Sequence, residues 1–501
     1  MSEATDSQDR QPIPEFKQVM GHPSPLWMLF MSEFWERFAF YGIRWALVLY
    51  IVAQFYSGDQ SGQADANLTY GSYLALVYAS AIFGGYVADK IIGYQRSILI
   101  GAVFMAAGLF MIMMPDPMLF KFGLATVIVG NGLFKPNIST MVGKLYSIND
   151  ERRDSGFTIF YMGINMGAFI APIITGWLAT SLFGTDAAPA YQYVFGAAGV
   201  GMLISMVWFY FGRRQLQDIG RPPVEARGRE RVAYVSIGAL CVIPLVYALL
   251  MLGAEALQYV LTALFVGLAA MLMIEGIRGG AVARDKTIAM LIIFAFNILF
   301  WMFYEQAGNS FTFLADRIVN RDLGGFVFPT AWFQSVPALA VIMLAPVVAW
   351  LWVWLAKRNL NPSSPRKFGL GLLFNGLAFL LLMFVLTSLV SDAGKIPIWT
   401  MFAVYIIQVV GELCLSPIGL SMVTKLAPVR LVGLGMGGWF LSTGIGNNLS
   451  GIFAGAVCGE TGMTTTSALS GYTFGFWALV GSGVVLFLIA PLIQRLMHGV
   501  K

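Results

Sequence analysis

Apolar stretches long enough to cross a lipid bilayer recur along the whole chain. The hydrocarbon core of a bilayer takes a helix of about 20 apolar residues. The sequence predicts fourteen such segments, at approximately 26–55, 69–91, 95–114, 119–144, 156–181, 191–212, 231–252, 256–276, 287–310, 327–356, 368–391, 396–426, 430–456 and 471–496. Hydrophobic residues make up 58% of the chain and charged residues only 11%, which excludes a soluble globular protein. The strands of a membrane β-barrel would be about ten residues long, so we predict an all-α integral membrane protein.

Lysine and arginine are distributed unevenly among the connecting segments. If both ends of the chain lie in the cytoplasm, only Lys121, Arg317, Arg321 and Lys395 fall in loops on the opposite side. Cytoplasmic loops retain an excess of basic residues. The polar start of the chain has no short apolar core followed by a cleavage site, so no signal peptide is predicted. We expect a multi-pass protein of the cytoplasmic (inner) membrane with both termini cytoplasmic.

The most polar loop, 213–231, follows the sixth apolar segment and divides the chain. The seventh and eighth segments carry almost no internal charge, which is typical of lipid-facing accessory helices. The predicted domains are a cytoplasmic tail (1–25), an N-terminal six-helix bundle (26–212), a basic loop with two accessory helices (213–286), a C-terminal six-helix bundle (287–496) and a short cytoplasmic tail (497–501).

Charged side chains lie at bilayer depth in the first half of the chain. At 100° per residue, Glu33, Glu36, Arg37 and Arg44 share one face of the first segment with Tyr41. Lys135 lies well inside the fourth segment. Such residues normally face a water-filled cavity or a partner, so they predict a functional site.

The second half of the chain supplies carboxylates at the same depth. Glu305 lies in the ninth segment, and Glu412 lies in the twelfth with Ser416 one turn further on. A cavity between the halves would therefore be positive on one wall and negative on the other, which suits a zwitterion with separated charges. Titratable carboxylates beside cations also suit proton coupling, because protonation breaks ion pairs that hold a gate shut.

Other classes of function are disfavoured by residues that are scarce. The two histidines lie near the termini, and the three cysteines show no metal-ligand spacing, so neither a metal nor a cofactor other than the proton is predicted. A membrane-embedded enzyme would need histidine or a nucleophile–base pair inside the membrane, and we predict no enzyme. The net charge of +5 arises from loops beside the membrane, so no nucleic-acid partner is expected.

Several motifs resemble those of the proton-dependent oligopeptide transporters, a branch of the major facilitator superfamily. The most specific are E-F-W-E-R-F-A-F-Y-G at 33–42, F-T-I-F-Y-M-G-I-N-M-G at 157–167 and G-E-L-C-L-S-P at 411–417. Shorter matches stand at 130–137, 300–308 and 439–442. The loop motif GxxxDxxxGxxR, general to the superfamily, is formed by Gly85, Asp89, Gly93 and Arg96.

The resemblance implies a major facilitator fold that imports di- and tripeptides with protons by alternating access. It implies that Arg44 and Lys135 receive the peptide carboxylate and that Glu412 receives the amino terminus. The residues implied to line the pocket are Tyr41, Tyr78, Asn165, Trp301 and Trp439, with Ser416 beside Glu412. Those implied in proton coupling and gating are Glu33, Glu36, Arg37 and Glu305.

Two further expectations concern the empty site and the substrate. Without substrate, Glu412 is expected to pair with Lys135, because an unpaired carboxylate at that depth is costly. Pro337 stands where many members carry a pocket asparagine, which affects one peptide contact. A carrier of nitrate or of an amino-acid-like solute is the alternative, and Glu412 argues against nitrate. The expected partners are peptides, protons and membrane lipid, with a monomer as the working state.

Overall fold

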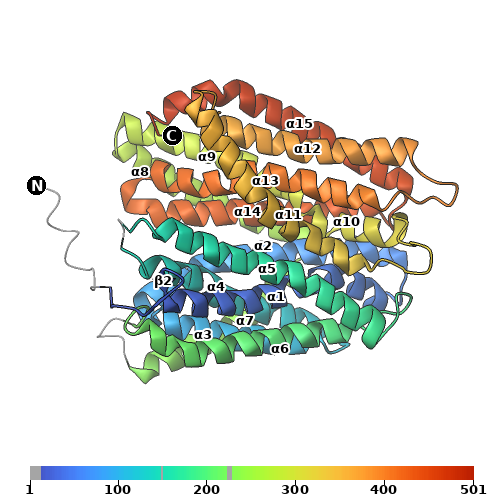
Figure 1. Ribbon diagram of the computed structural model, residues 1–501, viewed down its shortest axis with the longest axis horizontal. Helices are drawn as coiled ribbons and strands as arrows, with labels where there is room; N and C mark the ends of the chain where they lie inside the picture. The colour runs from blue at the N-terminus through green and yellow to red at the C-terminus, as the bar shows by residue number, and fades with distance from the viewer. Residues whose placement is uncertain (1–12, 148–149, 223–227, 501) are drawn as a thin grey trace, which may run out of the picture.

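Long helices lie side by side along the longest axis of the computed structural model, which describes residues 13–147, 150–222 and 228–500 (Figure 1). The long helices are α1 (Ser24–Phe55), α2 (Gln63–Val87), α3 (Tyr94–Ile112), α4 (Pro117–Lys144), α5 (Arg153–Trp177), α6 (Tyr191–Gly212), α7 (Arg229–Met251), α8 (Ala254–Arg278), α9 (Ala281–Tyr304), α11 (Val336–Lys357), α12 (Ser364–Ser388), α13 (Trp399–Leu426), α14 (Val432–Cys458) and α15 (Thr465–Leu496). The remaining elements are a short helix α10 (Ser310–Phe313) and an antiparallel pair of strands, β1 (Gln18–Val19) and β2 (His22–Pro23).

Each predicted apolar segment corresponds to one of these long helices, so the all-α membrane fold is confirmed. Within the described residues, 13 helices are long and apolar enough to cross a membrane. Helix α14 is not among them, because its glycines and the adjacent Asn447 and Asn448 dilute its apolar residues. It nevertheless packs between α2, α9 and α8, so it belongs to the interior of the bundle.

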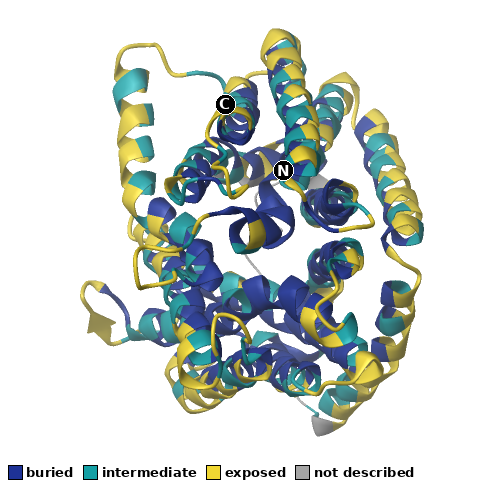
Figure 2. Cartoon of the chain, turned by 90° about the vertical axis from the view of Figure 1, so that its right-hand side faces the viewer, coloured by how far each residue is buried: buried dark blue, intermediate teal, exposed yellow. Residues whose placement is uncertain are grey.

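The helices form two groups that meet along a long seam. Figure 1 shows α1–α6 in the lower group and α9–α15 in the upper group, with α2 packed along α14 and α5 along α11. A Cβ atom added to Gly71 would lie 2.7 Å from the Cα of Gly451, so the α2 and α14 backbones approach closely here. The exposed residues lie mostly on the outer faces of both groups (Figure 2).

The two accessory helices contact different groups. Helix α7 packs on α4, where Tyr247 stacks on Phe122 with ring centroids 4.2 Å apart, whereas α8 packs on α14 and α9. Their other faces are exposed, as at Tyr234 and Tyr259. The lipid-facing position expected from their uncharged sequences is consistent with this packing.

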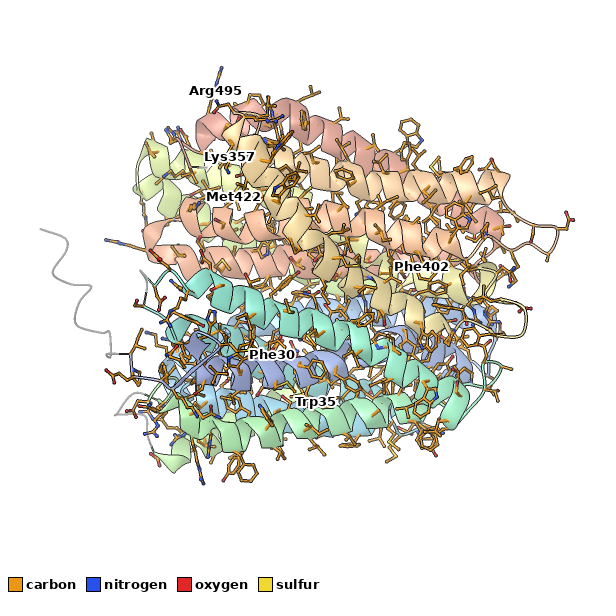
Figure 3. All side chains as sticks on the ribbon, viewed as in Figure 1. Phe30, Trp35, Lys357, Phe402, Met422 and Arg495 are labelled. Carbon is orange, nitrogen blue, oxygen red and sulfur yellow. The ribbon has the colours of Figure 1, made fainter. Side chains whose placement is uncertain are left out.

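Both described ends of the chain lie at the same end of the bundle. The β1–β2 pair and the last turn of α15 are at the left of Figure 1, and we call this the terminal end and its opposite the far end. Lys357 and Arg495 also lie at the terminal end (Figure 3). An even number of crossings places the ends together in this way, as the sequence predicted.

The close contact of α2 with α4 gives a stability prediction. A Cβ atom on Gly84 would lie 1.7 Å from the carbonyl oxygen of Gly132, and backbone cannot move aside as a flexible side chain can. The neighbouring Gly85 has nothing within 4 Å of such an atom. Overpacking costs about 1–3 kcal/mol, which outweighs the gain in helix propensity of up to about 1 kcal/mol. Gly84→Ala should therefore lower the melting temperature in detergent by several degrees, whereas Gly85→Ala should leave it unchanged or raise it. Equal melting temperatures for the two variants would contradict the packing argument.

Candidate functional site

A fully buried charge cluster occupies the first half of α1. The Arg37 guanidinium donates from Nη2 to Glu36 Oε1 at 2.6 Å, and its Nε lies 3.4 Å from Glu33 Oε1. Asn131 of α4 donates to the same Glu36 oxygen at 3.2 Å. Three of the charged residues predicted to share one face of this helix, Glu33, Glu36 and Arg37, therefore form one ion-pair network. A buried charge of this kind is tolerated only because each partner is compensated.

The second ion pair joins the two halves of the molecule. Arg44 of α1 donates from Nη2 to Glu305 Oε1 at 2.6 Å, and the Tyr70 hydroxyl of α2 donates to the same oxygen at 3.2 Å. Arg44 also donates from Nε to the Tyr70 oxygen at 3.2 Å. Arg44, predicted to bind the substrate carboxylate, is thus engaged by a carboxylate of the protein itself in this structure.

Glu305 lies where a membrane helix is interrupted. Helix α9 ends at Tyr304, and Glu305–Gly308 form a 3₁₀ turn before α10. The side chain of Asn309 donates to Ser450 Oγ at 2.7 Å, and Gln306 donates to the Ser450 carbonyl at 3.1 Å. Irregular backbone at membrane depth survives only when neighbouring groups satisfy it, and such breaks commonly mark functional positions.

Lys135 carries a charge without a close carboxylate. Its Nζ lies 5.1 Å from the centre of the Tyr78 ring and 5.8 Å from that of Phe40, which is cation–π range. Within the described part of the chain, no carboxylate oxygen lies within 4.0 Å of Nζ. Tyr41, Tyr78 and Lys135 are all only half-buried although they lie between the helical groups. Solvent therefore reaches this part of the interface.

Glu412 of α13 has a different partner from the one predicted. It accepts a hydrogen bond from the hydroxyl of Tyr304, at the end of α9. The expected Lys135–Glu412 pair is absent among the described residues, so that expectation is wrong for this conformation. A neutral hydroxyl from the same half satisfies Glu412, and the aromatic rings of Tyr78 and Phe40 contact Lys135 instead. Ser416 lies one turn from Glu412, and its hydroxyl is buried without a hydrogen-bond partner in the described structure.

The remaining predicted pocket residues fall into two environments. Asn165 of α5 is largely buried and donates to the carbonyl of Tyr161 at 2.9 Å. Half-buried Trp301 donates to Asn297 Oδ1 at 3.0 Å. Trp439, by contrast, is buried in an aromatic group with Phe294 and Phe368. Trp301 and Asn165 therefore hydrogen-bond within their own helices, whereas Trp439 packs among aromatic rings.

The loop motif lies at the terminal end, between α2 and α3. Asp89 lies in a π-helical turn (Ala88–Ile92) and accepts a hydrogen bond from the Tyr94 hydroxyl. Gly93 has φ +78, where a Cβ would be strained. Arg96 donates to the carbonyl of Gly228 at 3.2 Å, which links the motif to the residue directly before α7.

Pro337, which stands where the resemblance implied a pocket asparagine, lies in the first turn of α11. Proline is well tolerated there, because the missing N–H has no partner within the helix. The preceding Ser335 donates from Oγ to the Phe169 carbonyl of α5 at 2.7 Å, so this turn closes on the first half.

Hydrogen bonds between the halves gather toward the far end. They include Met463 N to Gln63 Oε1 at 2.8 Å, Asn67 Nδ2 to Cys458 Sγ at 3.3 Å and the ion pair Arg321–Asp186 at 2.8 Å. These contacts and the Arg44–Glu305 ion pair hold the two helical groups together at the far end.

Three tyrosines that contribute to the site were not predicted from the sequence. Tyr70 donates to Glu305, Tyr304 donates to Glu412, and Tyr161 is within electrostatic range of Glu412. A signal was present for Tyr304, which stands three residues after Trp301 and so shares its side of the helix. Tyrosines are too frequent in the apolar segments for the others to be singled out.

Two packed helical groups that are joined by a buried ion pair at an interrupted helix are typical of a secondary transporter of the major facilitator type. Residues 95–467 match PTR2, the POT family. The chain is 35% identical to the peptide transporter YePEPT of Yersinia enterocolitica, covering 97% of this chain and 98% of that one. It is 32% identical to the di-/tripeptide transporter of Lactococcus lactis, with 97% and 98% covered. The chain therefore belongs to the POT family of multi-pass membrane transporters.

Solved structures agree with this assignment. A peptide transporter POT in complex with sulfate superposes with a TM-score of 0.82 at 33% identity, over 97% of this chain and 98% of that chain. A POT family transporter in complex with 5-aminolevulinic acid gives a TM-score of 0.80 at 28% identity, over 95% and 98%.

Proposed function

We propose that this chain imports di- and tripeptides into the cytoplasm together with protons. The observation that carries the proposal is the charge arrangement between the halves, with Lys135 and Arg44 on one side and Glu412 and Glu305 on the other. A peptide zwitterion presents a carboxylate and an ammonium group several bonds apart, which suits separated opposite charges. The names of the relatives, peptide transporters and di-/tripeptide permeases, support the same substrate class.

The Arg44–Glu305 pair is the proposed coupling element. It spans α1 and the interrupted end of α9, so the far end stays closed while the pair is intact. Protonation of Glu305 removes the charge that holds Arg44. Arg44 is then free to receive the substrate carboxylate, and the halves can separate at the far end. The proton is the only coupling ion in this scheme, and no other cofactor is required.

The buried α1 network has a supporting role in the proposal. Glu33, Glu36 and Arg37 lie within electrostatic range of Lys135. A proton or substrate charge arriving at Lys135 therefore changes the balance of this network. We propose that it transmits occupancy of the site to α1, which also carries Arg44.

We propose that the protein lies in the inner membrane of a bacterial cell. In this orientation the terminal end faces the cytoplasm. Lys357, Arg495 and the arginines that follow α6 lie at that end, in keeping with the excess of basic residues in cytoplasmic loops. With the far end closed, the site would face the cytoplasm here. The chain is proposed to act as a monomeric carrier without enzymatic activity.

The carboxylate contact gives a prediction for Lys135→Ala. A charged hydrogen bond contributes about 1.5–3 kcal/mol, so affinity for an ordinary dipeptide should fall by about 10- to 150-fold. Affinity for the C-terminally amidated dipeptide should change much less, because that ligand has no carboxylate. Binding measured for both ligands on both proteins tests this, and equal losses would remove the carboxylate role.

An amino-acid-like solute is the second candidate, favoured by the related transporter that was solved with 5-aminolevulinic acid. Counterflow uptake of a labelled dipeptide into proteoliposomes separates the two. Unlabelled di- and tripeptides should compete strongly, whereas alanine, 5-aminolevulinic acid and nitrate should compete weakly. Stronger competition by either amino-acid-like ligand than by peptides would favour the second candidate, and competition by nitrate would favour an anion carrier.

A further inference from the structure

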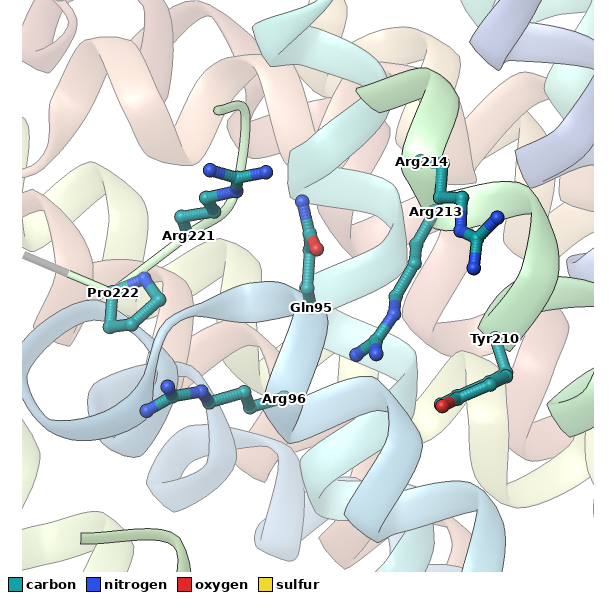
Figure 4. Close-up of a pocket in the computed structure, with 7 residues that line it drawn as sticks. All are labelled: Gln95, Arg96, Tyr210, Arg213, Arg214, Arg221 and Pro222. Atoms are coloured by element: carbon teal, nitrogen blue, oxygen red, sulfur yellow. The ribbon is translucent and has the colours of Figure 1, made fainter. Parts of the chain in front are cut away.

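A basic pocket lies at the terminal end, where α3 begins and α6 ends (Figure 4). It holds about 430 Å³, a size typical of sites for small ligands. Its lining residues are Gln95, Arg96, Tyr210, Arg213, Arg214, Arg221 and Pro222. Of the described residues that form its wall, four are arginines and none is acidic. The transport site does not include this pocket.

The arginines come from three segments of the chain. Arg213 lies over the ring of Tyr210, with its guanidinium carbon 4.5 Å from the ring centre. Arg221 pairs with the exposed Asp218 at 2.8 Å. Within the described residues, no carboxylate lies within 4.0 Å of the Arg213 or Arg214 guanidinium. Two positive charges in one recess thus remain available to an anion.

The wall of the pocket is formed before any ligand arrives. Gln95 donates from Nε2 to the Ile219 carbonyl at 2.7 Å, and its backbone N–H donates to the Gly220 carbonyl at 3.0 Å. A Cβ on Gly93 would lie 2.5 Å from the nitrogen of Pro222, so this loop is held tightly against the start of α3. A preformed wall lowers the entropic cost of binding.

An apolar groove runs along the outer surface of α6, the same helix whose end lines the basic pocket. It holds about 570 Å³, and its main lining residues are Val200, Leu203, Ile204, Val207, Trp208 and Phe211. These residues recur every three or four positions and so form one face of the helix. Its lining residues nearest the terminal end are Gly212 and Gln215, which flank Arg213 and Arg214 of the basic pocket in the sequence.

We infer that the basic pocket binds the phosphate group of an anionic phospholipid, with one acyl chain in the apolar groove. Arginine guanidinium groups match phosphate oxygens with paired N–H donors. Exposed Tyr210 and Trp208 at the end of α6 are typical of side chains at the level of lipid headgroups. A free phosphate ion shares the headgroup chemistry, but only a lipid also uses the groove. The inference does not depend on peptide transport.

The expected consequence is a more stable N-terminal half. Bound phosphate would link α3, the end of α6 and the loop at 219–222. A ligand that binds only the folded protein raises its melting temperature with concentration.

Thermal unfolding of the full-length protein in a neutral detergent tests the inference. Phosphatidylglycerol should raise the melting temperature of the wild type, and phosphatidylcholine and inorganic phosphate should do so only at much higher concentration. Arg213→Gln/Arg214→Gln should need at least about tenfold more phosphatidylglycerol for half of the effect. The matched control is Arg278→Gln/Arg358→Gln, which removes two exposed arginines at the ends of α8 and α11 and should behave as the wild type.

Two outcomes would overturn the inference. One is an equal dependence on phosphatidylglycerol in both double variants, which would show adsorption by charge alone. The other is full stabilisation by inorganic phosphate with no further effect of lipid, which would make the pocket a site for soluble phosphate.

A second measurement covers the groove and needs no arginine variant. Phosphatidylglycerol with brominated acyl chains should quench Trp208 fluorescence, measured as the difference between the wild type and Trp208→Phe. The quenching should saturate at the lipid concentration that stabilises the wild type. Equal quenching in the wild type and in Trp208→Phe would show that no acyl chain lies in the groove and would contradict the inference.

Discussion

Glu305→Gln should abolish accumulation of a dipeptide against its concentration gradient, while counterflow exchange continues. The amide resembles a protonated carboxyl group, so it cannot release a proton and cannot hold the charge of Arg44 as the 2.6 Å ion pair does. Exchange requires the carrier to change conformation with substrate bound, but it needs no net movement of protons. Uptake of labelled dipeptide under an imposed proton gradient measures accumulation. Uptake into proteoliposomes that are preloaded with unlabelled dipeptide, without a proton gradient, measures exchange.

A control variant separates loss of coupling from loss of charge. Glu275→Gln removes a carboxylate of α8 that lies 3.9 Å from the exposed Arg278, away from the interface between the halves. It should accumulate peptide as the wild type does. If Glu305→Gln still concentrates peptide, Glu305 is not the coupling group and the role proposed for its pair with Arg44 fails.

Glu412→Gln should remove the preference for a free amino terminus. The wild type is expected to bind an ordinary dipeptide much more tightly than its N-acetylated analogue, because only the former carries an ammonium group for Glu412. The substitution keeps the shape and removes the charge. Affinity for the ordinary dipeptide should therefore fall by about 10- to 150-fold, with little change for the analogue.

The hydrogen bond from Tyr304 supplies the matched variant for this test. Tyr304→Phe leaves the charge of Glu412 in place and removes the hydroxyl that it accepts. This variant should keep the preference for a free amino terminus. If acetylation weakens binding to Glu412→Gln as much as to the wild type, the ammonium group is recognised elsewhere. That result would contradict the proposal that the two charged ends of the peptide bind opposite charges of the site.

The fold could be predicted from the sequence because each long helix corresponds to one apolar stretch of the chain. Even α14, whose glycines and asparagines lower its apolar content, was located from the run at 430–456. The even number of apolar stretches predicted that both ends of the chain lie at the same end of the bundle. The interruption at Glu305 could not be predicted, because the polar residues that satisfy it, such as Ser450, come from another helix.

The depth of the charged residues was predictable, but their partners were not. The helical period places Arg37 beside Glu33 and Glu36 on one helix, and those contacts form. Partners on different helices depend on how each helix is rotated and shifted along its axis, which the period of one sequence does not give. Charge alone therefore predicts a pair between Lys135 and Glu412, whereas in the structure Glu412 accepts a hydrogen bond from Tyr304.

The basic pocket shows the same limit. The sequence marks the loop at 213–231 as polar and basic, but nothing in it indicates that Arg96 of the distant loop motif lies against the same recess. Nor does the sequence show that residues on either side of Arg213 and Arg214 line an apolar groove.

Peptide uptake into proteoliposomes under an imposed proton gradient tests the central claim most directly. Vesicles loaded at neutral pH and diluted into acidic buffer should concentrate a labelled dipeptide above the outside level, and a protonophore should collapse the accumulation to equilibrium. The same vesicles without a pH gradient should only equilibrate. Accumulation that is unchanged by the protonophore, or a gradient-driven flux of another solute with none of peptide, would contradict proton-coupled peptide import by this chain.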